Sequence, residues 1–194
     1  MKQNTSGAEN PFCAFSISKT KNSKLPDILM AGYAGLDGSI QITEEKKEEL
    51  KTRYSENFLQ KTLWLKQELI SDKALFGGMP VYELGEGGIF QGLWDLASML
   101  DVGIEIHQDQ ILVKQQTIEV ANFFTIDPYQ LRSKGCFLFI SEDGYRMVHE
   151  LEKKGIPAAV IGVATHSNDR VILSYGEQRF LEKRYTDALT QLKL

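Results

Sequence analysis

The sequence predicts an α/β fold, and two observations support this prediction. Short apolar runs of strand length, such as 135–140 and 158–163, alternate with segments such as 89–100 whose apolar residues recur at helical spacing. The 194 residues are 42% hydrophobic, 25% charged and 10% aromatic, which is close to the average for soluble globular proteins. We therefore expect one folded domain over 26–194, preceded by a polar leader over 1–25 with one edge strand at 12–17.

The first half of the domain is expected to open with a buried strand, because the run 28–35 is apolar and ends in glycines. A tight turn over 35–38 should follow. Thr43 has the side chain of an N-cap and predicts a charged helix over 44–53. Ser55 predicts the start of a second helix in the same way.

Helices and strands continue to alternate in the second half. The helix 89–100 should end at Gly103, followed by a strand over 103–107 and a helix over 115–124. Asp127 before Pro128 predicts a further capped turn, and 135–140 a buried strand.

The last quarter is expected to hold a helix over 142–154 that points Tyr145 inward, then a strand over 158–163. A closing hairpin should turn around Gly176. A short helix over 187–192 should end the domain.

The strongest functional signal is a glycine-rich elbow over 83–88 that runs directly into the helix 89–100. Gly85, Gly87 and Gly88 can adopt backbone angles closed to other residues, and the first turn of a helix has unpaired amide hydrogens. Together these features can bind a phosphate or another anion. The alternative is structural: the glycines let a strand turn sharply and let the helix pack close to the sheet.

Two carboxylates and a second set of glycines extend this candidate site. Glu83 and Glu86 could hold magnesium or accept protons, but carboxylates at a helix start also stabilise the helix dipole without any ligand. Gly32, Gly35 and Gly38 could bring amides near a phosphate as a secondary loop, or could serve only the geometry of a turn.

The sequence indicates no metal site and no catalytic base or thiol. His107, His149 and His166 are far apart, and neither they nor the two cysteines have zinc-ligand spacing. Cys136 begins an apolar strand, which favours a buried inert thiol, whereas Cys13 lies in the leader.

Charge and hydropathy exclude other classes of function. A net charge of −4 gives no broad basic surface, so we expect no nucleic-acid partner. There is no apolar run of membrane-spanning length and no secretory signal, so we expect no membrane contact and a reduced, cytoplasmic setting.

The order of these segments resembles a known family. The runs 27–35, 83–100, 102–106, 131–138 and 155–162 are together similar to the carboxy-terminal domain of the aminoimidazole ribonucleotide synthetase superfamily, over about Pro26 to Leu192. Its hydrogenase-maturation-type members resemble the chain most.

This resemblance implies a mixed β-sheet with helices packed on one side. It also implies ATP and magnesium chemistry, but for the family only, because an amino-terminal domain supplies most of the nucleotide site there. The leader is too short to be that domain, so this chain is expected to bind no cofactor alone.

The elbow departs from the family pattern, which reads His-Asp-x-Thr, then Gly or Glu, then two glycines. Here Tyr82, Glu83 and Gly85 stand at the His, Asp and Thr positions, while Glu86-Gly87-Gly88 is kept. The hydroxyl that could bind phosphate or cap the helix is therefore missing.

These points predict a binding module that is not catalytic by itself. It is expected to bind either a partner or a small phosphorylated ligand, the ligand through Glu83, Gly85, Glu86, Gly87 and Gly88. The alternative is a subunit of a split ATP-dependent enzyme, of the purine-biosynthesis or hydrogenase-maturation type, active only with a separate nucleotide-binding chain. The expected partner is that subunit or a second copy, because apolar faces left by a missing domain tend to form contacts.

Overall fold

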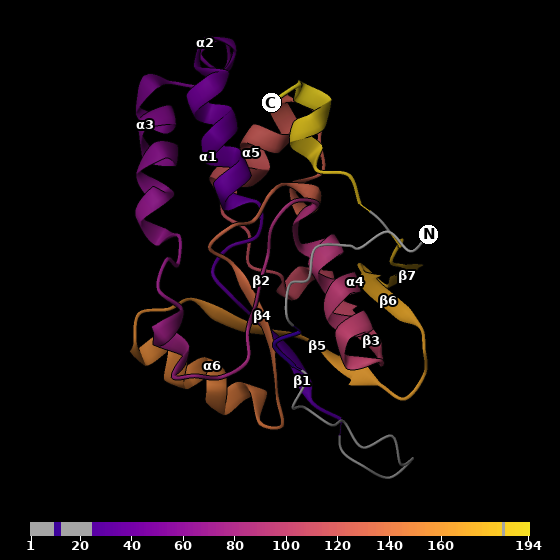
Figure 1. Ribbon diagram of the computed structural model, residues 1–194. Helices are drawn as coiled ribbons and strands as arrows, with labels where there is room; N and C mark the ends of the chain where they lie inside the picture. The colour runs from indigo at the N-terminus through magenta and orange to yellow at the C-terminus, as the bar shows by residue number, and fades with distance from the viewer. Residues whose placement is uncertain (1–9, 13–24, 184) are drawn as a thin grey trace, which may run out of the picture.

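Seven strands form one mixed sheet in the order β2-β4-β1-β5-β3-β6-β7 (Figure 1). The computed structural model describes residues 10–12, 25–183 and 185–194. The strands are β1 (Asp27–Ala31), β2 (Tyr82–Glu83), β3 (Gly103–His107), β4 (Phe137–Ser141), β5 (Ala158–Thr165), β6 (Arg170–Ser174) and β7 (Glu177–Phe180).

In the described part of the chain, six α-helices and several 3-10 turns accompany the strands. The α-helices are α1 (Leu36–Glu45), α2 (Lys47–Leu50), α3 (Glu56–Trp64), α4 (Gly88–Leu100), α5 (Gln115–Phe123) and α6 (Gly144–Lys153). The 3-10 turns are η1 (Leu65–Glu68), η2 (Lys73–Phe76), η3 (Gln108–Gln110), η4 (Pro128–Gln130) and η5 (Ala188–Leu192).

The central strand β1 precedes the other described strands in the sequence. It pairs antiparallel with β4 on one side, where Leu29 lies opposite Phe139, and with β5 on the other, where Leu29 lies opposite Val160. The β3–β6 pair is parallel and the remaining pairs are antiparallel. The expected α/β class and mixed sheet are therefore confirmed.

Successive side chains of β1 point to opposite faces of the sheet, and each face has its own helix. Ile28 and Met30 belong to the apolar cluster that includes α4, whereas Leu29 and Ala31 belong to the cluster that includes Leu151 of α6. Helices therefore cover both faces, with α6 opposite α4, and not one side as the resemblance implied. The difference arises because β1 is apolar on both of its faces.

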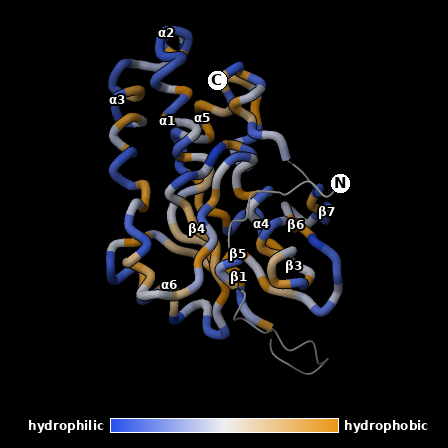
Figure 2. The backbone as a smooth tube through the Cα atoms, viewed as in Figure 1, coloured by the Kyte–Doolittle hydropathy of each residue, from blue (hydrophilic) through white to orange (hydrophobic). Residues whose placement is uncertain are grey.

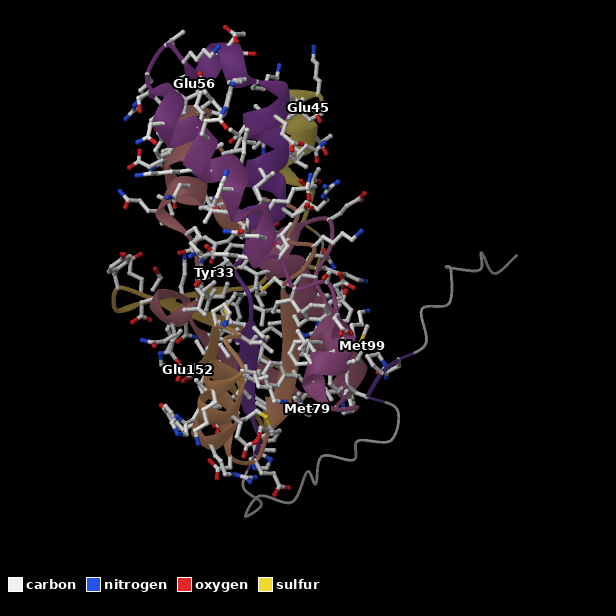
Figure 3. The ribbon with its side chains drawn as sticks, turned by 90° about the vertical axis from the view of Figure 1, so that its left-hand side faces the viewer. Tyr33, Glu45, Glu56, Met79, Met99 and Glu152 are labelled. Carbon is white, nitrogen blue, oxygen red and sulfur yellow. The ribbon has the colours of Figure 1, made fainter. Side chains whose placement is uncertain are left out.

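A group of helices packs at one end of the molecule, beside the sheet, and is called the helical end below. Helices α1 and α5 and the turn η5 share a third apolar cluster that includes Ile42, Val120 and Leu189. Figure 3 shows Glu45 and Glu56 at this end, Glu152 at the opposite end, and Tyr33 between them. In Figure 2 the tube is mostly hydrophilic around α2, where the helical end meets solvent.

Helix α1 begins earlier than the sequence pattern predicts. Gly35 is the residue before the helix and has φ 70°, so 36–38 form the first helical turn where a separate tight turn was expected. Thr43 lies inside α1, where its hydroxyl donates to Ser39 O at 2.8 Å, and it is not an N-cap. Ser55 does cap α3, because its side chain accepts the Phe58 N–H.

Two details of the second half are also corrected. Helix α4 ends at Asp101, which takes φ 53°, so Gly103 begins β3 and does not terminate the helix. A Cβ on Gly103 would lie 2.4 Å from Thr165 Oγ1, which explains the glycine by close packing. Tyr145 is 78% exposed and faces solvent, while Gly144 and Leu151 are the buried residues of α6.

Part of the expected leader contacts the domain. Phe12 is buried in the α4 cluster, and the Asn10 side-chain amide donates to Met99 O at 3.3 Å. The rest of the expected edge strand, including Cys13, lies outside the described residues.

None of the helices in the described part of the chain is both long and apolar enough to cross a membrane.

Candidate functional site

The elbow has the strand-to-helix geometry that the sequence predicts. Strand β2 pairs with β4, and Leu84 N–H continues the pairing by donating to Cys136 O at 2.9 Å. The chain then turns, and α4 begins at Gly88 with Gly87 before it at φ 75°. Such a backbone angle favours glycine over any residue with a side chain.

One amide of the elbow already binds a carboxylate of the same chain. Gly87 N–H donates to Asp187 Oδ2 at 2.9 Å, and the other oxygen of Asp187 accepts Leu189 N–H at 2.9 Å. Asp187 is buried. The place where an anion was expected is thus partly filled by the C-terminal segment, 100 residues further along the chain.

The three elbow glycines have different surroundings. A Cβ on Gly88 would lie 2.3 Å from Tyr129 O and 2.7 Å from Leu131 O, so this glycine lets α4 approach another backbone segment. A Cβ on Gly85 would meet nothing within 4 Å. The structural reading therefore explains Gly88 completely, while Gly85 stays open to solvent.

The secondary glycine loop packs against the same segment from another side. A Cβ on Gly35 would lie 2.6 Å from Pro128 O, one on Gly32 would lie 2.8 Å from Gly135 O, and Gly38 N–H donates to the Arg132 carbonyl at 3.0 Å. Both glycine loops thus converge on the segment 128–136. Close packing against this segment is therefore enough to explain the glycines of the secondary loop, and no ligand is needed.

Ser133 joins the two loops and was not predicted as a site residue. Its hydroxyl accepts the Gly35 N–H and donates to Leu131 O, both at 2.8 Å, and its own N–H donates to Gly85 O at 3.1 Å. The side chain is fully buried. A serine between two charged residues gives no periodic signal, so the sequence alone could not reveal this role.

Arg132 lines the surface beside the elbow, and it forms an ion pair with Asp37 of α1. The hydrogen bond to Asp37 raises the pKa of the guanidinium, and the charges of Asp187 and Glu86 act in the same direction. The guanidinium therefore stays charged inside a mainly acidic environment.

A cleft of about 710 Å³ lies beside the elbow, between α1, the start of α4 and the C-terminal segment 185–194. Its walls are polar apart from two leucines and a tyrosine: they are formed by Gln41, Glu86, Gln91, Arg132, Tyr185, Thr186, Asp187, Leu189, Thr190 and Leu194. The Gln41 Oε1 atom is buried and has no hydrogen-bond partner. The cleft thus offers both donors and acceptors to a small polar molecule.

The two carboxylates predicted for the candidate site have different surroundings. Glu83 forms an ion pair with Lys73 at 3.0 Å, whereas Glu86 lines the cleft. Among the described residues no three histidine, cysteine, aspartate or glutamate side chains converge as metal ligands. With Gly87 N–H also engaged, the elbow of the described chain does not fit a magnesium triphosphate.

Tyr82, at the histidine position of the family pattern, has a structural partner. Its hydroxyl donates to Asp95 Oδ2 at 3.0 Å, and Gln91 donates to the other oxygen of the same carboxylate at 2.9 Å. Burial raises the pKa of Tyr82, and the charge of Asp95 adds to the effect. The phenol therefore stays protonated and ties β2 to α4.

The remaining candidates lie away from the elbow. His107, His149 and His166 are exposed at separate places on the molecule. Cys136 is fully buried, and burial raises the pKa of its thiol to about 12. The expectation of an inert thiol agrees with this environment.

Comparison with known proteins gives the fold. No family model matches the chain, and no curated protein matches its sequence. Among solved structures, HypE of E. coli, a hydrogenase maturation protein, matches with a TM-score of 0.64 and 16% identity, over 88% of this chain and 53% of HypE.

Two further structures match in the same way. A HypE in complex with ATP has a TM-score of 0.61 and 16% identity over 88% of this chain and 54% of its own. Thiamine-monophosphate kinase from Stenotrophomonas maltophilia has a TM-score of 0.55 and 14% identity over 83% and 53%. The chain spans about half the length of these proteins. The chain therefore shares the fold of about half of HypE and of thiamine-monophosphate kinase, as the resemblance in its sequence implies.

Proposed function

We propose that this chain is a binding module that does not turn over ATP alone and that acts with a second, nucleotide-handling polypeptide. The contact between Asp187 and Gly87 carries the proposal. It places a carboxylate of the chain itself on the helix amide that a phosphate would use, at 2.9 Å. A free triphosphate would have to displace this charge and approach Glu86 as well, which electrostatics opposes.

The comparisons support the need for a second part. A structure with about half of its length in this fold is described as a complex with ATP. The elbow here has Glu83 paired with Lys73, and its described residues lack a converging set of carboxylates. We therefore assign the nucleotide and magnesium ligands to the partner.

The first test is magnesium-dependent ATP hydrolysis by the purified chain. We expect none above a no-protein blank. Clear turnover that is abolished by Glu83→Gln would overturn the proposal, because the site would then be complete on this chain.

The second test uses the product of an adjacent gene, where one encodes an acidic, glycine-rich nucleotide domain. The two proteins should co-elute in equal amounts, and hydrolysis should appear only in the mixture. Glu86→Lys on the cleft should weaken the complex, whereas Glu150→Lys on the outer side of α6 should not. Separate elution of two folded proteins would contradict the proposal.

A second candidate function is binding of a small phosphorylated ligand in the cleft. The cationic Arg132 and the hydroxyl of Thr190 on its walls favour it. Titration calorimetry with inorganic phosphate and AMP tests it. We expect Asp187→Asn to bind more tightly than the unmodified chain and Arg132→Met to lose binding. Absence of heat with all three proteins would exclude this candidate.

A further inference from the structure

Strand β7 forms one edge of the sheet, and its four residues Glu177–Phe180 are all exposed. No strand of the described residues pairs with its outer side. An edge strand presents unpaired amide and carbonyl groups that can add another strand. β7 is therefore a place where a second chain can extend the sheet.

The hairpin geometry shows which backbone groups point outward. Leu181 N–H donates to Arg170 O of the strand beside it at 2.8 Å. Inward and outward groups alternate along an antiparallel strand, so Arg179 and Glu177 also point toward β6. Gln178 and Phe180 then direct their N–H and C=O groups away from the sheet.

The side chains alternate as well. Arg179 lies over the ring of Phe90 on the α4 face, with its guanidinium carbon 4.6 Å from the ring centre. Glu177, two residues away, lies on the same face. Phe180 lies on the opposite face and is 63% exposed.

We propose that β7 pairs antiparallel with β7 of a second copy of this chain, about a two-fold axis at Gln178. In this register the two Gln178 residues exchange backbone hydrogen bonds. Glu177 of each copy lies opposite Arg179 of the other, which gives two opposite-charge pairs on one face. A two-fold arrangement repeats every favourable contact.

The register centred on Arg179 is less favourable. An axis at Arg179 would place the two arginines directly opposite each other, which is destabilising. In the Gln178 register, Phe180 also comes beside the hairpin turn of the other copy, where Gly176 has no side chain to block its ring. Charged residues on an edge usually prevent pairing. Here they select a partner with the complementary pattern, and the chain itself has that pattern.

Charge exchange tests the pairing by sedimentation velocity. We expect the unmodified chain to form a dimer. Glu177→Arg alone or Arg179→Glu alone puts like charges opposite each other, and each should weaken the dimer by about tenfold. The double variant E177R/R179E restores both pairs and should dimerise again. An equal mixture of the two single variants should form a heterodimer.

Controls separate pairing from folding. Arg179 also donates to Gln108 Oε1 at 3.2 Å, so its replacement can affect the monomer. Circular dichroism of each variant, together with the double variant and the mixture, keeps the test decisive. Tyr145→Ser on exposed α6 should not change the dimer.

Gln178→Pro removes only an outward N–H and should give a monomer. A monomeric unmodified chain at about 100 μM would overturn the proposal, since edge pairing should be populated there. A dimer that the single variants leave intact, or a folded double variant that stays monomeric, would also overturn it. Either result leaves the ATP proposal unaffected.

Discussion

The Ser133 hydroxyl accepts the Gly35 N–H at 2.8 Å, across 98 residues of sequence. The same serine holds Gly85 through its own amide. The geometry of the elbow therefore depends on a residue that belongs to neither glycine loop.

Ser133→Ala should lower the free energy of unfolding by about 1–3 kcal/mol, because it leaves a buried amide and a buried carbonyl without partners. Thermal and urea unfolding measure the loss. Ser98→Ala, at an exposed position of α4, is the control and should cost almost nothing. Equal stabilities of the two variants would show that Ser133 is not a structural link.

Gly88→Ala and Gly85→Ala form a matched pair within the elbow. The first should cost about 2–5 kcal/mol, because its Cβ meets the Tyr129 carbonyl and its backbone is strained at positive φ. The second should cost under about 1 kcal/mol, because a Cβ there meets nothing. A large loss at Gly85 would instead point to a role of its open surface.

Asp187→Ala should release the C-terminal segment from α4. It removes the acceptor for both Gly87 N–H and Leu189 N–H, at a cost of about 1–3 kcal/mol. Hydrogen exchange should increase at these two amides and along η5. The exposed Asp109→Asn is the control. Unchanged protection at Gly87 would mean that the carboxylate contact is not maintained in solution.

The thiol of Cys136 should be unreactive in the folded protein. In a Cys13→Ser background, a disulfide reagent at pH 8 should modify Cys136 only after unfolding. Because burial raises the pKa of this thiol from 9.0 to about 12, the unfolded state loses its proton first. Stability should therefore fall as pH rises from about 9 toward 12. Rapid modification of the native protein would contradict the buried environment.

Local patterns in the sequence predict much of the fold. The strands at 103–107 and 158–163, the hairpin around Gly176 and the Ser55 cap all depend on neighbouring residues, and the structure contains each of them. The start of α1 was misplaced because Gly35 replaces a side-chain cap by its backbone angle. The second helix-covered face was missed because a doubly buried strand has no polar side to reveal it.

The candidate site was predicted less completely, for a physical reason. The sequence shows the glycines and carboxylates of the elbow, but Asp187, Ser133 and Arg132 reach it from distant segments. Contacts between residues so far apart in the sequence leave no periodic signal. The ligand assignment of Glu83, Gly85, Glu86, Gly87 and Gly88 therefore stays a prediction.

The position of β1 has a consequence for synthesis of the protein. Of the described strands, this one leaves the ribosome before the others, yet its neighbours β4 and β5 begin at Phe137 and Ala158. Its two edges therefore stay without their partner strands until β4 and β5 have both emerged. Such non-local pairing makes folding slow and exposes nascent chains to aggregation. We therefore expect translation products that stop before β5 to be captured by chaperones or degraded.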